Sequence, residues 1–329
     1  MGNQLQLSFD YLLMSEEKND YTNVYEFLTK LPIFYYGQNN PDLFELEREF
    51  IYHQTKYQVR LRRTRISKDD DMFLTSKDQD VLDTLLFLAT KESTPKQIVN
   101  GRIRIKVSIN QIYTQLNRKI RYEDIKKSIQ RLKEAQIQIK TLDPNRPKIE
   151  WNTESIISQY LIEDERATKN IFDDDNVVHT YIEFNSSFTQ ELLSGKIKLL
   201  FFPKYISLKH PLSKYIYKQL VLSDMFSSNN YEKYYHNKSL FTYLLNSGYQ
   251  TDTTINKNNT MRAFRQALKE LKEVGLLDID KCDLKAKKEK NKIVDYFIKL
   301  TPSQWLVDEN HQQRKKKTRK NNSKKIKSI

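Results

Sequence analysis

The chain has 329 residues, 38% of them hydrophobic, which is enough for two medium-sized domains with separate cores. It contains no apolar run of about eighteen residues that could span a membrane, and its single cysteine excludes an internal disulfide and fits a reducing cytoplasm. The formal net charge is +14, and the final stretch HQQRKKKTRKNNSKKIKSI holds two Arg and seven Lys against no acid, which favours a polyanionic partner.

The beginning of the chain lacks the features of a targeting segment. MGNQLQLSFDYLLMSEEKND has no basic region leading into a clean apolar stretch, so we expect no secretory signal, and residues 1–20 are expected to be loosely ordered. Further on, EREFIYHQTKYQVRLRRTRI predicts a β-hairpin, because apolar residues alternate on either side of the polar HQTK. SKDDD is expected to be a loop. DQDVLDTLLFLATKE predicts a helix with Asp78 as its N-cap.

The next segments continue to alternate between predicted strands and predicted helices. Gly101 opens RIRIKVS, a short strand, and INQIYTQLN predicts a short helix that Asn117 ends. KIRYEDIKKSIQRLKEAQ predicts a long helix. IQIKTL and KIEW enclose the turn DPNRP and predict a second hairpin. The chain continues with the expected strand SIISQYLIEDER, the acidic loop IFDDDN and a further strand, VVHTYIEF. The sequence does not define the path of the acidic insertion, residues 163–176.

The second half of the chain repeats this order. HPLSKYIYKQLVLSDMF predicts a helix, SLFTYLLN a short helix, and NNTMRAFRQALKELKEVG a long helix with Thr260 as N-cap and Gly275 as its stop. LLDID and IVDYFIKL flank the lysine-rich KCDLKAKKEKNK, a two-stranded wing. We therefore expect an α+β protein with two tandem winged helix-turn-helix domains, over residues 21–200 and 201–308, followed by a disordered basic tail, 309–329.

The two long helices have nearly the same pattern. IKKSIQRLKEAQI and FRQALKELKEVGL place apolar residues at matching positions, so each helix has one narrow apolar face. Long cationic and amide side chains occupy the other face. Arg and Lys can donate to guanine, Gln can pair with adenine, and additional cations neutralise phosphates. A solvated surface with the same Lys and Glu content is the structural alternative.

These patterns give a set of candidate DNA-binding residues in three groups. The first helix contributes Arg121, Lys126, Lys127, Gln130, Arg131 and Lys133. The second helix contributes Arg262, Arg265, Gln266 and Lys269. The wing of the second domain contributes Lys285, Lys287, Lys288 and Lys290.

Four stretches resemble the plasmid replication initiator family, of the replication initiator protein A type. They are LPIFYYG with the hairpin EFIYHQTKYQVRL, then LTSKDQDVLDTLLFLA, then VSINQIYTQLNRKIRYEDIKKSIQRLKEAQIQI, and finally LLFFPKYISLKHPLSKYIYKQL. The resemblance covers roughly residues 30–300 and rests on pattern. Two features depart from the family: His210 precedes Pro211 where relatives place a basic residue, and the acidic insertion interrupts the later strands of the first domain.

The resemblance implies a function on double-stranded DNA. Such proteins bind direct repeats (iterons) of a plasmid origin as monomers, help to melt adjacent DNA, and bring in the host initiator and the replicative helicase. Many also repress their own promoter as dimers. By this resemblance, the first helix would serve one half-site and the second helix the other. A winged-helix transcription regulator without an initiation role is the alternative interpretation.

The sequence offers no catalytic constellation, so we expect no enzyme activity, no cofactor and no metal. The five histidines are scattered, and no pair of glycines has the spacing of a phosphate-binding loop. One cysteine with dispersed histidines gives no zinc site. The acidic triplets at 69–71 and 173–175 could serve a two-metal site, but each lies in a polar stretch with no strand pattern to fix its geometry.

Overall fold

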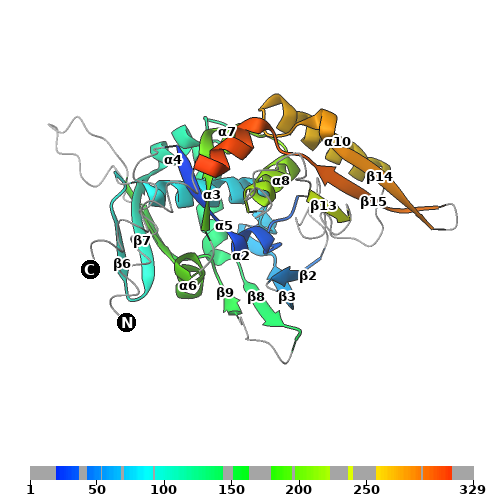
Figure 1. Cartoon of the computed structure of the whole chain (residues 1–329). Helices are drawn as coiled ribbons and strands as arrows, with labels where there is room; N and C mark the ends of the chain where they lie inside the picture. Colours follow the sequence, from blue (N-terminus) through cyan, green and yellow to red (C-terminus); the bar gives the residue numbers. More distant parts are fainter. Residues whose placement is uncertain are drawn as a thin grey trace, which may run out of the picture.

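Helices and antiparallel sheets alternate along the chain, which confirms the α+β class expected from the sequence (Figure 1). The computed structural model describes residues 20–36, 43–52, 54–67, 70–91, 93–143, 151–162, 179–194, 197–222, 236–239, 257–289 and 292–312. All pairings between the named strands of these residues are antiparallel.

A four-stranded sheet combines the two hairpins expected in the first half. Its strands are, in sheet order, β2 (Glu45–Tyr52), β3 (Thr55–Arg62), β8 (Ile137–Thr141) and β9 (Trp151–Glu154). The first expected hairpin is confirmed as the pair β2–β3. The second is also a strand pair, β8–β9, but β9 overlaps the expected strand KIEW only at Trp151, and residues 148–150 lie outside the described residues. The sequence did not indicate that β8 also pairs with β3. The second hairpin is therefore part of a larger sheet and does not stand out as a free wing.

The expected loop SKDDD belongs in part to a small hairpin. β4 (Thr64–Ser67) pairs with β5 (Asp70–Met72), so the expectation of a loop is wrong for Ser67, Asp70 and Asp71. Arg63 explains how an acidic stretch forms a strand: its guanidinium donates to the Asp71 carbonyl at 2.9 Å and lies 3.5 Å from the Asp71 carboxylate. The acidic loop IFDDDN lies outside the described residues.

A second four-stranded sheet forms around the strand RIRIKVS. Its order is β10 (Ile157–Ile162), β11 (His179–Phe184), β7 (Arg102–Ser108) and β6 (Lys96–Val99). β6 and β7 are joined by Asn100 and Gly101, both at positive φ, 51° and 73°. Such values at two central residues are typical of a tight hairpin turn, so Gly101 closes a hairpin that the sequence reading had not identified.

Three helices pack beside these sheets: α3 (Ser76–Thr90), α4 (Ile109–Gln115) and α5 (Tyr122–Glu134). The N-cap of α3 is Thr75, and Asp78 is the third helical residue of a capping box, so the assignment of Asp78 as N-cap is wrong. The Asp78 carboxylate accepts from Thr75 N at 2.7 Å and from Thr75 Oγ1 at 2.9 Å. Asn117 has φ 52°, and α4 ends just before it, as expected.

The C-terminal part begins with a strand that returns to the start of the chain. β12 (Ile197–Phe201), which follows α6 (Ser186–Ser194), pairs with β1 (Tyr21–Tyr25), and β1 leads into α2 (Glu26–Lys30). Two helices then follow, α7 (Phe202–Ser207) and α8 (Pro211–Leu222). The ring of Phe202 stacks on that of Phe87 with 4.0 Å between centroids, so α7 packs directly against α3.

The last part of the chain forms a three-stranded sheet and one long helix. The order of the sheet is β13 (His236–Ser239), β15 (Lys292–Leu300) and β14 (Asp283–Glu289), with α10 (Lys257–Glu273) between β13 and β14 in the sequence. α10 begins at Lys257, so Thr260 lies inside its first turn and the N-cap assignment is wrong. Most of SLFTYLLN lies outside the described residues. Residues 304–312 are helical, so the first residues of the expected tail continue a helix.

α10 ends in a left-handed turn at Gly275, as expected. Gly275 has φ 69°, its N–H donates to the Lys272 carbonyl at 2.8 Å, and the Leu276 N–H donates to the Leu271 carbonyl at 2.8 Å. This pair of hydrogen bonds is a Schellman motif. It satisfies carbonyls that would otherwise be unpaired at the helix end.

Replacing this glycine tests the turn. Gly275→Ala is expected to lower the free energy of unfolding by about 1–2 kcal/mol, because a Cβ strains a residue held at positive φ. The added Cβ would meet only Lys204 Nζ, at an ordinary 3.5 Å, so the cost is in the backbone. Gly275→Asn should recover part of the loss, since Asn tolerates this conformation. Urea unfolding of the three proteins measures the effect; an Ala variant as stable as the wild type would contradict it.

Candidate nucleic-acid interface

α5 has one buried face and one largely cationic face. Ile125, Ile129 and Leu132 are fully buried against the core. On the other face, Lys127 is exposed, and Lys126, Gln130 and Lys133 are partly exposed. Arg121 is the N-cap residue, and 86% of its side chain is accessible. The apolar face therefore holds the helix in place while most of the candidate side chains reach the surface.

Acids on the same helix accompany several of these cations. The pairs, each at 3.2 Å, are Arg121 with Asp124, Lys126 with Glu123 and Lys133 with Glu134. Burial raises the pKa of the Asp124 carboxyl, but the hydrogen bond from Arg121 and the charge of Lys77 outweigh burial and leave this pKa below its ordinary value. Exposed pairs of this kind contribute about 0–1 kcal/mol each, so a phosphate can compete with the carboxylate for the cation.

Arg131 is an exception, and its assignment as a surface contact is wrong. Its side chain is only 6% exposed, and Nε lies 2.9 Å from the Asp78 Oδ1 of α3. A second nitrogen of the guanidinium lies 3.3 Å from Ser128 Oγ. The cause is that α3 packs along this flank of α5, and the fully buried Asp78 requires a cation. Arg131 therefore holds two helices together.

α10 repeats the two-faced arrangement. Phe264, Ala267 and Leu271 are fully buried. Four candidate side chains of the opposite face are exposed: Arg262, Arg265, Gln266 and Lys269. Among the described residues, Arg262 and Arg265 have no ion-pair partner, and Lys269 lies 3.8 Å from Glu273.

Glu270 does not contribute a free carboxylate to the cationic face of α10, because its carboxylate is hydrogen-bonded to another segment. Its carboxylate accepts hydrogen bonds from the backbone N–H groups of Lys209, at 2.5 Å, and His210, at 3.0 Å, just before α8. An acid at the beginning of a helix is electrostatically favourable there. The accessible face of α10 therefore contains fewer acids than the sequence pattern suggested, which strengthens its positive potential.

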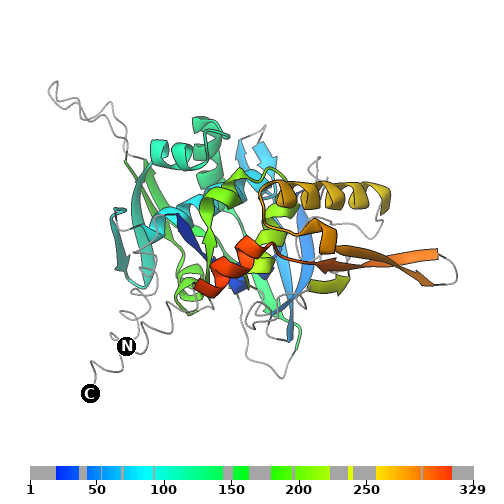
Figure 2. The same cartoon turned by 45° about the horizontal axis from the view of Figure 1, so that its top comes forward.

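The β14–β15 hairpin adds exposed lysines beside α10. Lys285, Lys287 and Lys288 are exposed, and Lys290 lies outside the described residues. Lys285 pairs with Asp283 at 3.2 Å. In both views the hairpin and α10 extend together at one end of the molecule, opposite the end that contains β6 and β7 (Figures 1 and 2).

Tyr122 is a candidate that the sequence reading missed. It opens α5, is 41% exposed, and its ring lies 4.4 Å from that of Tyr113 in α4. Its hydroxyl donates to Asn110 Oδ1 at 2.7 Å. The cluster of Tyr122, Tyr113 and Asn110 lies at the N-terminal end of α5 and offers hydrogen-bond donors suited to phosphate. The available signal was an aromatic residue directly after Arg121, at the first position of the helix.

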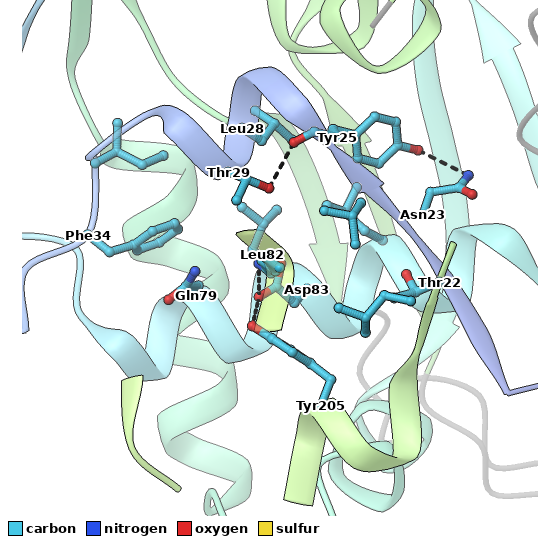
Figure 3. A pocket seen from close by; sticks show the side chains of 15 residues that line it. Thr22, Asn23, Tyr25, Leu28, Thr29, Phe34, Gln79, Leu82, Asp83 and Tyr205 are labelled. Carbon is cyan, nitrogen blue, oxygen red and sulfur yellow. Dashed lines mark hydrogen bonds and ion pairs between the residues drawn. The ribbon is translucent and has the colours of Figure 1, made fainter. Parts of the chain in front are cut away.

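The part of the chain that the structure describes contains no group of three or more His, Cys, Asp or Glu side chains arranged to hold a metal ion. None of its helices is long and apolar enough to cross a membrane. One cavity, of about 30 Å³, lies where β1, α2 and α3 meet α7 and α8 (Figure 3). A space of this size holds on the order of one water molecule.

No family model and no curated protein sequence matches the chain. A crystal structure of domains 2 and 3 of RctB is similar, with a TM-score of 0.50 and 15% identity over 80% of this chain and 94% of that one. A second structure of RctB domains 2-3 has a TM-score of 0.46 and 14% identity, over 82% of this chain and 95% of that one. The structure of the Pi initiator protein in complex with iteron DNA has a TM-score of 0.45 and 14% identity, over 69% of this chain and 91% of that one. At 15% identity the first of these matches shows a shared fold, over most of both chains.

Proposed function

We propose that this protein is a plasmid replication initiator that binds repeated sites in double-stranded origin DNA through two winged-helix domains. The first domain would span residues 21–200 and the second residues 201–308. In each, the long helix, α5 or α10, would enter the major groove and a β-hairpin would contact the backbone.

The topology of the two halves supports this proposal. In the first half, with β6, β8 and β9 left aside, the elements follow in the order α3, β7, α4, α5, β10 and β11, and these three strands lie in the sheet order β10-β11-β7. In the second half, α8, β13, α10, β14 and β15 follow each other, and the sheet order is β14-β15-β13. In both, the last strand lies between the other two. By this correspondence, the wing of the first domain is β10–β11, which replaces our sequence-based choice of β8–β9.

One observation carries the functional argument: α5 and α10, at equivalent positions of the two halves, each combine a fully buried apolar face with an accessible cationic one. Packing alone does not require such cations. We propose that Arg121, Lys126, Lys127, Gln130 and Lys133 bind one half-site and Arg262, Arg265, Gln266 and Lys269 the other. The wing lysines would neutralise phosphates. Two modules on one face of the duplex would contact grooves about 34 Å, or roughly 10 bp, apart.

The remaining parts of the proposal concern partners. As an initiator, the protein would bind origin repeats as a monomer, repress its own promoter as a dimer, and recruit the host initiator and the replicative helicase. It would perform no hydrolysis itself, since the host proteins would supply the energy for unwinding.

A gel-shift series tests the proposal directly. The full chain and a duplex carrying the repeats beside its own gene are expected to bind with a Kd in the nanomolar range. With about six phosphate contacts, affinity should fall roughly a thousandfold between about 50 and 200 mM salt, because counterions are released on binding. Binding that does not respond to salt, or that does not distinguish this duplex from a scrambled one, would refute it.

A genetic measurement separates initiation from transcriptional regulation. Deleting the gene from a minimal plasmid is expected to abolish autonomous replication, and supplying the protein in trans should restore it. If the deletion changed only the expression of neighbouring genes, the regulator would be the correct interpretation.

A further inference from the structure

The two cationic helices are joined through one segment, residues 202–222, which contains α7 and α8 and is called the connector below. α5 is fixed to α3 by the buried Arg131–Asp78 pair. α3 contacts the connector, and the connector contacts α10. The rigidity of these contacts decides whether α5 and α10 can move relative to each other.

The contact between α3 and the connector combines the Phe87–Phe202 stack with buried charges. Lys214 Nζ lies 2.5 Å from Asp80 Oδ1, and Lys218 Nζ lies 2.7 Å from both oxygens of Asp83. The two lysine side chains are only 5% and 12% exposed. Tyr205 of α7 donates its hydroxyl proton to the same Asp83 (Figure 3). Burial raises the pKa of Tyr205 well above its ordinary value, so the hydroxyl remains a donor.

Buried pairs of this kind resist displacement. Separating them would leave a charge without a partner in the interior, which is strongly unfavourable. Two such pairs side by side hold α8 in one position along α3. The junction therefore differs from the mobile interface that is usual between two domains of a chain, because its charges are paired and buried.

A further contact comes from the turn between α4 and α5. Lys119 Nζ donates to the carbonyl oxygens of Ile206, at 2.5 Å, and Ser207, at 3.2 Å, at the C-terminal end of α7. Its cationic end satisfies carbonyls that a helix leaves unpaired. The turn that leads into α5 is thus attached directly to the connector.

α10 is attached to the other side of the connector. The Glu270 carboxylate accepts from the backbone N–H groups that precede α8, and Ser213 Oγ donates to the Ala267 carbonyl at 3.3 Å. Lys204 of α7 donates to the Val274 carbonyl, and its Nζ lies 4.2 Å from the centre of the Trp305 ring. The connector is therefore bonded to both ends of the C-terminal half of α10.

We propose that the connector is a rigid bracket that fixes the spacing between the two half-sites, with Lys119 and Glu270 as positioning residues. The inference rests on the proposed function. Adding one base pair between half-sites moves the second by about 3.4 Å and turns it by roughly 34°. A flexible linker would tolerate this change. A bracket bonded to both helices cannot follow it, so the protein should demand one spacing.

The test uses the full chain and duplexes that it selects from a randomised pool of about 40 bp, roughly four helical turns. Footprinting locates the two half-sites, and a series of duplexes then varies the spacer by −2 to +2 bp. The wild type is expected to lose about tenfold or more in affinity for each base pair of change, the size of one disrupted base contact.

Two variants, Lys119→Met and Glu270→Ala, are combined to loosen the bracket without uncovering a buried charge. The combined variant should show a spacing penalty reduced by about fivefold, while its affinity for a duplex with a single half-site stays within about twofold of wild type. Lys209→Met replaces an exposed lysine within the connector, controls for the loss of one positive charge and should retain the wild-type penalty. Circular dichroism confirms that each variant is folded, and Lys119→Met alone serves if the combined variant is not.

The outcomes separate the two proposals. A folded variant that keeps the full spacing penalty, or a wild type indifferent to the spacer, overturns the bracket and leaves the proposed function intact. If the selection enriches no duplex, the proposed function fails, and the bracket with it.

Discussion

Replacing Arg131 with Met is expected to lower the free energy of unfolding by about 3–5 kcal/mol, because it leaves Asp78 buried without its cation. Asp78 is completely inaccessible, and it also accepts two capping hydrogen bonds from Thr75. These bonds stabilise a carboxylate less than the guanidinium at 2.9 Å does. Urea unfolding followed by circular dichroism measures the loss.

Two comparison variants make this result specific. Lys127→Met removes an exposed cation from the same helix and should change stability by less than about 0.5 kcal/mol. Adding Asp78→Asn to Arg131→Met removes the unpaired charge and should restore part of the stability. If Arg131→Met were as stable as wild type but bound DNA weakly, the residue would be a surface contact, and the buried pair would not have the role described.

Replacing Arg265 with Ala should have the largest effect on DNA binding. If the guanidinium donates to a guanine, affinity for the selected duplex falls by about 1–3 kcal/mol, or about 5- to 150-fold, and preference relaxes at one base position. Stability should not change, because Arg265 is exposed and no ion pair joins it to the described residues. Fluorescence anisotropy with duplexes altered one base at a time measures both effects.

Lys272 and Lys285 provide matched controls. Lys272→Ala removes an exposed cation from the last turn of α10, where Asp280 is 3.7 Å away, and should leave affinity nearly unchanged. Lys285→Ala in the wing should weaken binding to all duplexes alike and reduce the salt slope by about 1, as expected for one phosphate contact. A Lys272 variant as defective as that of Arg265 would mean that net charge, and not base contact, sets the affinity.

Local patterns in the sequence predicted the elements that depend on local physics. The period of apolar residues located α3, α5 and α10, and strand alternation located the hairpin β2–β3. Gly275 was recognisable as a helix stop because few other residues adopt its left-handed conformation. Each of these features is decided within a few neighbouring residues.

Features that depend on a distant partner could not be predicted in this way. A helical projection placed Arg131 on the outer face of α5, but it cannot show that α3 covers that flank and presents Asp78. Glu270 likewise looked like a surface acid, but it accepts two hydrogen bonds from the backbone N–H groups of Lys209 and His210, just before α8. The pairing of β8 with β3 joins segments that no local pattern relates. The accessible faces of α5 and α10 were therefore predictable from the sequence, except at Arg131, while the contacts between the elements that support these helices were not.

The pairing of β1 with β12 has a consequence for biosynthesis. Tyr21 lies opposite Phe201, so the first described strand is made long before its partner. While the ribosome synthesises the residues between them, the buried side chains of β1 have no strand to cover them, and an unpaired strand is exposed to misassembly. The N-terminal half can reach its final form only after β12 has been translated. Chaperone dependence and slow maturation of the nascent chain would follow from this long-range closure.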